Sequence, residues 1–172
     1  MNLTAALLQN SNEAFDFLAD YDWAKAVPYL TSVEVNTDLS NRFYAAWITH
    51  GEKMRISIGN DRDLVRVLRR WAPPYAGNAV RLYRGESFSR HSEGRIGLCW
   101  TPKRATAECF GSGLQAIHPG GGLLLCAEFP ATAIIAAGSY HSKYLDEKEF
   151  TVDVTMLPPI EVLRHFPKLE TG

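Results

Sequence analysis

The spacing of the hydrophobic positions is helical in the first half of the chain. Up to about residue 75, apolar side chains recur three and four residues apart, which places them on one face of an α-helix. Trp47 and Trp71 fall on such stripes and are expected to anchor the core. Capping residues, glycines and prolines mark the ends of these stretches and predict helices over 12–20 and 23–30. A further helix is predicted from a cap at Asp38 to a stop at Gly51, and another from a cap at Asn60 or Asp61 to an end at Pro73-Pro74.

After Asn78 the pattern changes to short apolar or alternating segments that are typical of β-strands. Residues 102–110 favour a short helix instead, with Thr101 as its N-cap, and the glycine-rich stretch 111–122 predicts a loop. Strands are expected over 79–84, ended by Gly85, and over 95–101, 122–129, 133–137, 147–154 and 160–166. Helices followed by short strands predict an α+β fold with antiparallel or mixed pairing.

The segment from Glu147 to Val154 alternates strictly between polar and mostly apolar residues. Strict alternation is the period of a β-strand, so Glu147 and Glu149 would share one face with Thr151 and Asp153. Two residues along a strand are roughly 6.5–7 Å apart, so the two carboxylates would point into the same space. An exposed strand with a solvated acidic face is the alternative interpretation.

Length and charge limit the classes of protein to consider. With 172 residues the chain is expected to be a single domain, with a helical part over 1–75 and a β-rich core over 79–166. The formal net charge of −1 gives no electrostatic case for direct nucleic-acid binding. No stretch approaches the roughly 20 apolar residues of a membrane span, and residues 1–9 do not resemble a secretory signal.

The three cysteines, Cys99, Cys109 and Cys126, form no Cys-x-x-Cys pair. This number and spacing argue against a disulfide framework and against a zinc site, so no metal is expected. A cytoplasmic location is the corresponding expectation.

Three segments of the second half resemble, in order, the motifs of mono-ADP-ribosyltransferases of the arginine–serine–glutamate class. They are Leu82-Tyr83-Arg84-Gly85, then Cys99-Trp100-Thr101 leading into Ala107-Glu108-Cys109-Phe110, then Glu147-Lys148-Glu149. The resemblance implies that residues 79–166 form an NAD-binding β-sheet core of the ADP-ribosyltransferase type. It also implies that NAD is the co-substrate and that a side chain of a target protein receives the ADP-ribose.

The same resemblance assigns roles to individual residues. Glu149 would stabilise the positive charge that develops on the ribose as nicotinamide leaves, and Glu147 would orient or deprotonate the acceptor. Arg84 suits the pyrophosphate because its planar fork makes paired, charge-assisted hydrogen bonds. The backbone at Gly85 would clamp the nicotinamide amide, and Tyr144 would lie on a loop that recognises the target, although local packing is an equal alternative for this tyrosine.

Cys99 stands where the family has its first serine. A thiol is a weaker hydrogen-bond donor than a hydroxyl, so either Thr101 supplies the hydroxyl, or Cys99 serves poorly, or the site is partly degenerate. A cysteine nucleophile with His91, His118 or His141 as its base is a competing interpretation.

The sequence therefore predicts an NAD-dependent mono-ADP-ribosyltransferase, with arginine as the first guess for the acceptor because Glu-x-Glu accompanies arginine acceptors in relatives. Small intracellular relatives include phage proteins and toxins that disable a host protein, and the expected lack of a signal peptide agrees with these settings without selecting one. An NAD glycohydrolase, in which water is the acceptor, is one alternative. A binding module that kept the fold and inhibits a partner protein by contact is the other.

Overall fold

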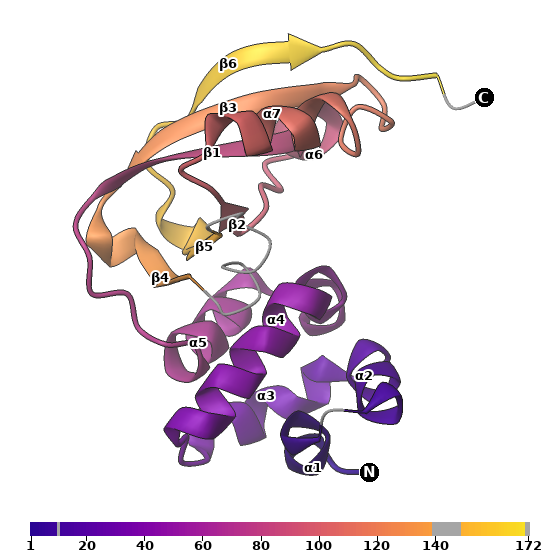
Figure 1. Cartoon of the computed structure of the whole chain (residues 1–172), viewed down its shortest axis with the longest axis vertical. Coiled ribbons are helices and arrows are strands. Elements are labelled where there is room, and N and C mark those ends of the chain that lie inside the picture. Colours follow the sequence, from indigo (N-terminus) through magenta and orange to yellow (C-terminus); the bar gives the residue numbers. More distant parts are fainter. Residues whose placement is uncertain (10, 139–148, 171–172) are drawn as a thin grey trace. The chain divides into compact units, whose positions relative to one another are not determined.

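The computed structural model describes residues 1–9, 11–138 and 149–170. These residues fall into two compact units, the first formed by Met1–Pro74 and the second beginning at Tyr75. The fold is α+β, with helices in the first unit and two small antiparallel sheets in the second (Figure 1). The expected class and the helical N-terminal half are therefore confirmed.

The first unit is a cluster of helices, each of which begins at a polar capping side chain. The helices are α1 (Leu3–Leu8), α2 (Asn12–Ala19), α3 (Trp23–Ser32), α4 (Thr37–Ile58) and α5 (Asp61–Trp71). Their caps are Asn2, Ser11, Asp22, Asn36 and Asn60, whose side chains accept hydrogen bonds from backbone N–H groups of the first turn.

Helix α4 is longer at both ends than the sequence predicted. Its cap is Asn36, whose Oδ1 accepts from the backbone N–H of Leu39 at 2.9 Å, so Asp38 lies inside the first turn. Gly51 does not stop the helix but lies inside it, where a Cβ atom would come within 3.0 Å of the ring of Trp47. The helix ends instead at Gly59, whose positive φ of 68° reverses the chain.

Tryptophan side chains anchor the core of this unit, as expected. Trp71 is buried, and its indole N–H donates to the backbone oxygen of Leu30 at 2.6 Å. Trp47 is also buried. Both rings therefore serve packing within the first unit rather than contact with a ligand.

The second unit contains two three-stranded sheets in which every neighbouring pair is antiparallel. One sheet has the order β1-β3-β6, formed by Val80–Ser87, Gly122–Phe129 and Glu161–Phe166. The other has the order β2-β5-β4, formed by Cys99–Trp100, Phe150–Val152 and Ile134–Ala137. Shorter elements connect the strands: α6 (Phe88–Ser92), α7 (Arg104–Ser112), and 3₁₀ turns over Ala131–Ala133 and Val154–Met156.

The strand boundaries differ from the sequence prediction at three positions. Strand β1 does not end at Gly85 but continues to Ser87. The strand expected over 95–101 shortens to Cys99–Trp100. The strand expected over 147–154 shortens, within the described residues, to Phe150–Val152, because Asp153 caps a 3₁₀ turn by accepting from the backbone N–H of Thr155.

Alternation along β1 divides the core of the second unit in two. Leu82, on one face, packs in a cluster with Trp100, Leu125 and Val152 of the other strands. Tyr83, on the other face, packs with Ala107 of α7 and with neighbouring apolar side chains. Helix α7 lies along β1 and β3 (Figure 1). The even-numbered side chains of β1 therefore face away from α7, and this side carries the polar residues described next.

Candidate functional site

The first two segments that resemble motifs contain the neighbouring strands β1 and β2, and Glu149, the described residue of the third, directly precedes β5. Tyr83 of β1 and Thr101, directly after β2, form an isolated antiparallel bridge. Strand β2 then pairs with β5, Cys99 opposite Thr151 and Trp100 opposite Phe150. Segments that are far apart in the sequence thus meet in the order β1, β2, β5.

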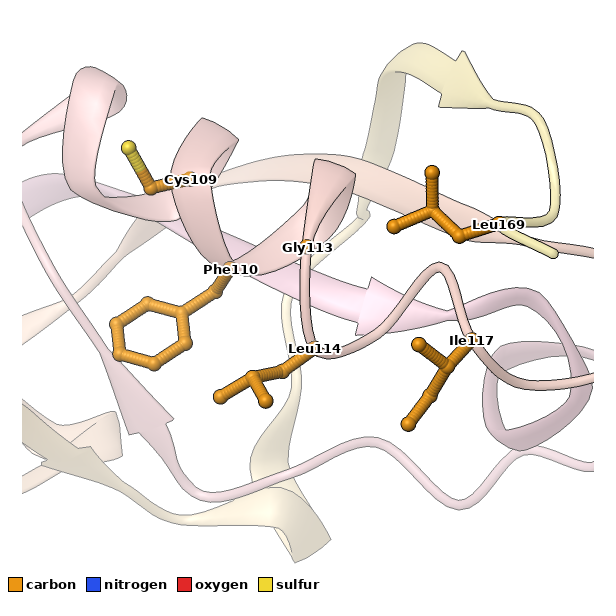
Figure 2. Close-up of a pocket in the computed structure, with 6 residues that line it drawn as sticks. All are labelled: Cys109, Phe110, Gly113, Leu114, Ile117 and Leu169. Carbon is orange, nitrogen blue, oxygen red and sulfur yellow. The ribbon is translucent and has the colours of Figure 1, made fainter. Parts of the chain in front are cut away.

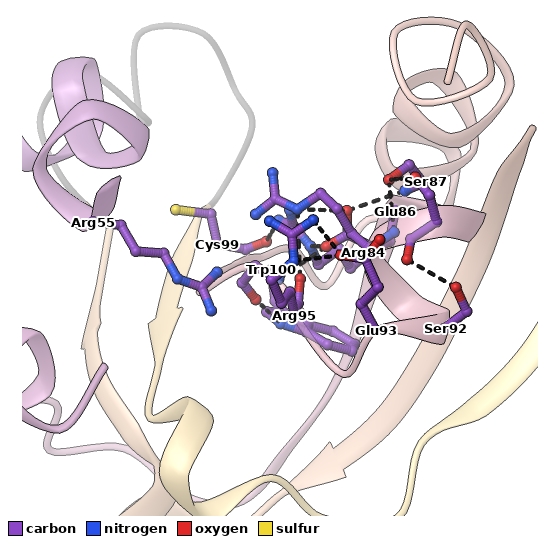
Figure 3. A network of polar contacts seen from close by, with 12 residues as sticks. Arg55, Arg84, Glu86, Ser87, Ser92, Glu93, Arg95, Cys99 and Trp100 are labelled. Carbon is purple, nitrogen blue, oxygen red and sulfur yellow. Dashed lines mark hydrogen bonds and ion pairs between the residues drawn. The ribbon is translucent and has the colours of Figure 1, made fainter. Parts of the chain in front are cut away.

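Arg84 is held by two hydrogen bonds to neighbouring residues. Its Nε donates to Oε2 of Glu86 at 2.8 Å, and its Nη1 donates to the carbonyl oxygen of Cys99 at 2.5 Å. The side chain of Arg84 is 14% exposed to solvent. Figure 3 shows the guanidinium group within this network. The structure therefore brings Arg84 and Cys99 together, through the backbone of the cysteine.

The partner of Arg84 is Glu86, a residue that the sequence reasoning missed. The carboxylate is completely buried and accepts hydrogen bonds from Arg84 and from the backbone N–H groups of Ser87 and Gly97, at 3.0 and 2.9 Å. Nε of Arg90 lies 3.6 Å from Oε1 of Glu86. Burial opposes ionisation, but the charge of Arg84 and these hydrogen bonds outweigh it and keep the pKa of Glu86 below its usual value. Glu86 is therefore a buried carboxylate rather than an acid that protonates at neutral pH.

Gly85 has a packing role that accounts for its lack of a side chain. A Cβ atom at this position would lie 2.3 Å from the backbone nitrogen of Gly111 and 2.4 Å from the carbonyl oxygen of Ala107. Both atoms belong to α7. The missing side chain of Gly85 thus allows helix α7 to pack closely against β1. The expected contact between the backbone of Gly85 and the nicotinamide amide stays a prediction.

Thr101 is buried and Cys99 is half-buried. The hydroxyl oxygen of Thr101 accepts from the backbone N–H of Lys103 at 3.1 Å, and α7 begins at Arg104 with Lys103 as its cap. Thr101 therefore stabilises the turn before the helix but is not the N-cap that the sequence predicted. The sulfur of Cys99 points away from Arg84 (Figure 3).

Glu149 lies directly before β5, and its carbonyl oxygen accepts from the backbone N–H of Gly138 at 3.1 Å. The residue is half-buried, and its Oε1 atom is shielded from solvent. The antiparallel register of β2 and β5, extended by one residue, sets Glu149 opposite Thr101. Glu147 and Tyr144, the other predicted residues of this motif, lie outside the described residues.

An apolar cavity of about 430 Å³ lies elsewhere in this unit. Figure 2 shows its lining, from α7, the following turn and the C-terminal segment: Cys109, Phe110, Gly113, Leu114, Ile117 and Leu169. It contains no charged lining residue, so it does not suit a pyrophosphate. In the described part of the chain, no cluster of three or more metal-binding side chains occurs, and no helix is long and apolar enough to cross a membrane.

Comparison with known proteins finds no matching family model, no similar curated protein and no similar solved structure.

Proposed function

We propose that this chain is an NAD-dependent mono-ADP-ribosyltransferase that modifies a side chain of a target protein, with arginine as the first acceptor to test. One observation carries the proposal. The first two segments that resemble the motifs of that family contain β1 and β2, and Glu149 of the third directly precedes β5, which pairs with β2. Strands β1 and β2 are joined by the bridge between Tyr83 and Thr101. Chance matches in the sequence would give no reason for Arg84, Cys99 and Glu149 to fall on or beside neighbouring strands.

The residues present suit the two charged parts of the reaction. Arg84 is a fixed cation of low exposure, which is what a pyrophosphate group requires. Glu149 is a half-buried carboxylate directly before β5, and its partial burial strengthens its effect on a developing positive charge.

The proposed reaction is a substitution at C1′ of the ribose that carries nicotinamide. The bond from C1′ to nicotinamide breaks and the electron pair leaves with nicotinamide, while the acceptor nitrogen forms a bond to C1′ and releases a proton. Glu149 stabilises the charge on the sugar, and Glu147 receives the proton from the acceptor. With water as the acceptor, the same site would be a glycohydrolase.

Two measurements on one reaction mixture test this proposal. The purified chain is incubated with NAD and a protein lysate, and both free nicotinamide and proteins that gain the mass of one ADP-ribose group are measured. We expect both products. Nicotinamide without modified protein would indicate the glycohydrolase. Neither product, together with retention of a lysate protein on the immobilised chain, would favour the binding module and contradict the enzyme.

A further inference from the structure

A buried ion pair in the second unit involves a carboxylate that the proposed reaction does not use. Glu86 follows Arg84 by two residues on β1, so their side chains share the strand face that is turned away from α7. The Glu86 side chain has no exposure at all. Burying a carboxylate is costly unless it is paired and hydrogen-bonded, so its contacts show what the surrounding structure is built to hold.

The carboxylate of Glu86 connects Arg84 to the segment before β2. Its Oε2 atom accepts both from Nε of Arg84 at 2.8 Å and from the backbone N–H of Gly97 at 2.9 Å. The carbonyl oxygen of Gly97 in turn accepts from the indole N–H of the buried Trp100 at 3.0 Å. Both backbone groups of Gly97 are therefore bound by side chains, and this glycine is fixed relative to Arg84.

Gly97 forms the surface on which the arginine rests. A Cβ atom at Gly97 would lie 2.0 Å from Nη2 and 2.2 Å from Cζ of Arg84, well inside van der Waals contact. The guanidinium group therefore occupies the space of the missing side chain. Glu86 holds it through Nε and the carbonyl oxygen of Cys99 holds it through Nη1. These contacts determine the orientation of the planar group.

We propose that Glu86 and Gly97 are positioning residues that hold Arg84 in a single orientation and leave Nη2 as the nitrogen that binds a phosphate oxygen of NAD. The identity of that ligand rests on the proposed function. Among the residues that the structure describes, no acceptor is bonded to Nη2. A guanidinium held in advance loses little freedom when it binds, so its contact with phosphate is stronger than that of a mobile arginine.

Gly97→Ala tests this proposal without removing a charge. The new methyl group would collide with the end of a flexible side chain, so Arg84 must turn away while the rest of the unit can stay in place. We expect affinity for NAD, measured by calorimetry, to fall by about tenfold or more, the effect of one charge-assisted hydrogen bond. Gly94→Asn is the matched control, because no atom lies within 4 Å of a Cβ at Gly94 and asparagine tolerates its φ of 70°.

A double-mutant cycle distinguishes positioning from general damage. If Gly97→Ala acts through Arg84, it should weaken NAD binding in the wild-type background and have no further effect in the Arg84→Ala background. An equal loss in both backgrounds, or no loss in either, would overturn the proposal.

The NMR signal of the Nε–H group of Arg84 provides a test that needs no NAD. Held by the buried Glu86, this proton should give a resolved signal that exchanges slowly with water. The signal should shift and exchange faster in Gly97→Ala and in Glu86→Gln. An unchanged signal in Gly97→Ala would refute the positioning role even if NAD binds. If the signal responds but the wild type does not bind NAD, the proposed function fails and the positioning of Arg84 stands.

Discussion

Tyr83 and Thr101 exchange both of their backbone hydrogen bonds, at 2.7 and 2.9 Å. This pair links β1 to the end of β2, and so joins the two sheets of the second unit. Because Arg84 follows Tyr83 directly, the link also holds the arginine against the carbonyl oxygen of Cys99. The candidate site therefore depends on backbone pairing as much as on its side chains.

Arg84→Ala should lower both stability and NAD affinity. Removing the cation leaves the buried Glu86 without its main partner, and breaking a buried ion pair costs roughly 3–5 kcal/mol. Loss of the phosphate contact should weaken NAD binding by about 2–3 kcal/mol. Chemical denaturation measures the first effect and calorimetry the second. Arg84→Lys should also bind NAD poorly, because a single ammonium group cannot bond Glu86, Cys99 and a phosphate in fixed directions.

Arg81→Ala is the control for this experiment. Arg81 lies on the same strand, but its side chain is 67% exposed and its partner Glu128 is exposed too. We expect little change in stability or NAD affinity. If Arg84→Ala behaved like Arg81→Ala in both measurements, Arg84 would have to be removed from the site.

Glu86 should contribute to the loss of stability in acid. Its pKa is lowered in the folded chain, so its stabilising effect is present above the usual value of 4.5 and is lost as pH falls through the lower, folded value. The melting temperature of Glu86→Gln should be well below that of the wild type at neutral pH. The difference between the two proteins should shrink below about pH 4.5, where Glu86 of the unfolded wild type is protonated. A difference independent of pH would contradict this account.

Gly85→Ala should destabilise the second unit by separating β1 from α7. The added methyl group would meet two backbone atoms of the helix, which cannot move aside as a side chain can. Overpacking of this kind costs about 1–3 kcal/mol. Thermal melting provides the measurement. Gly94→Asn is the control, because it also replaces a glycine but adds its side chain where no atom lies within 4 Å of the Cβ position. Equal melting temperatures for the two variants would mean that α7 does not pack on β1 as described.

The sequence names candidate residues for this site but not the contacts that support them. The strand alternation that pairs Glu147 with Glu149 could have revealed Glu86 as well, because it follows Arg84 at the same spacing of two. The shortness of β2 could not be predicted, since Gly97 bonds to a carboxylate eleven residues earlier in the chain. The continuation of α4 through Gly51 was not predicted either, because a glycine inside a helix has the same local signal as one that ends it.

Thr101 rather than Cys99 is expected to supply the hydroxyl group of the middle motif. Extended by one residue, the register of β2 and β5 would set Thr101 opposite Glu149, whereas Cys99 pairs with Thr151. Thr101→Val should therefore lose most NAD cleavage, and Cys99→Ala should lose little. Thr101→Ser is the control: it keeps the hydroxyl group and the turn bond to Lys103, so it should retain activity. If Cys99→Ser raised turnover while Thr101→Val kept it, the cysteine would hold the position of the family serine.

The two carboxylates of the last motif should separate the steps of the reaction. Glu149 is assigned to the sugar, so every reaction that cleaves NAD needs it. Glu149→Gln should lower nicotinamide release and protein modification together, by about 10²–10³ in rate, the usual effect of removing a preorganised electrostatic group. Glu147→Gln should suppress transfer to protein but leave slow hydrolysis of NAD by water.

Glu161→Gln is the matched control for these two variants, because Glu161 is an exposed acid on β6 of the same unit. It should change neither reaction. All three variants should stay folded, which thermal melting checks, and Glu161→Gln should melt at the wild-type temperature because its side chain is solvated. Equal losses of transfer and hydrolysis in Glu147→Gln and Glu149→Gln would refute the division of roles. Full biological effect in both variants would leave inhibition by contact as the activity of the chain.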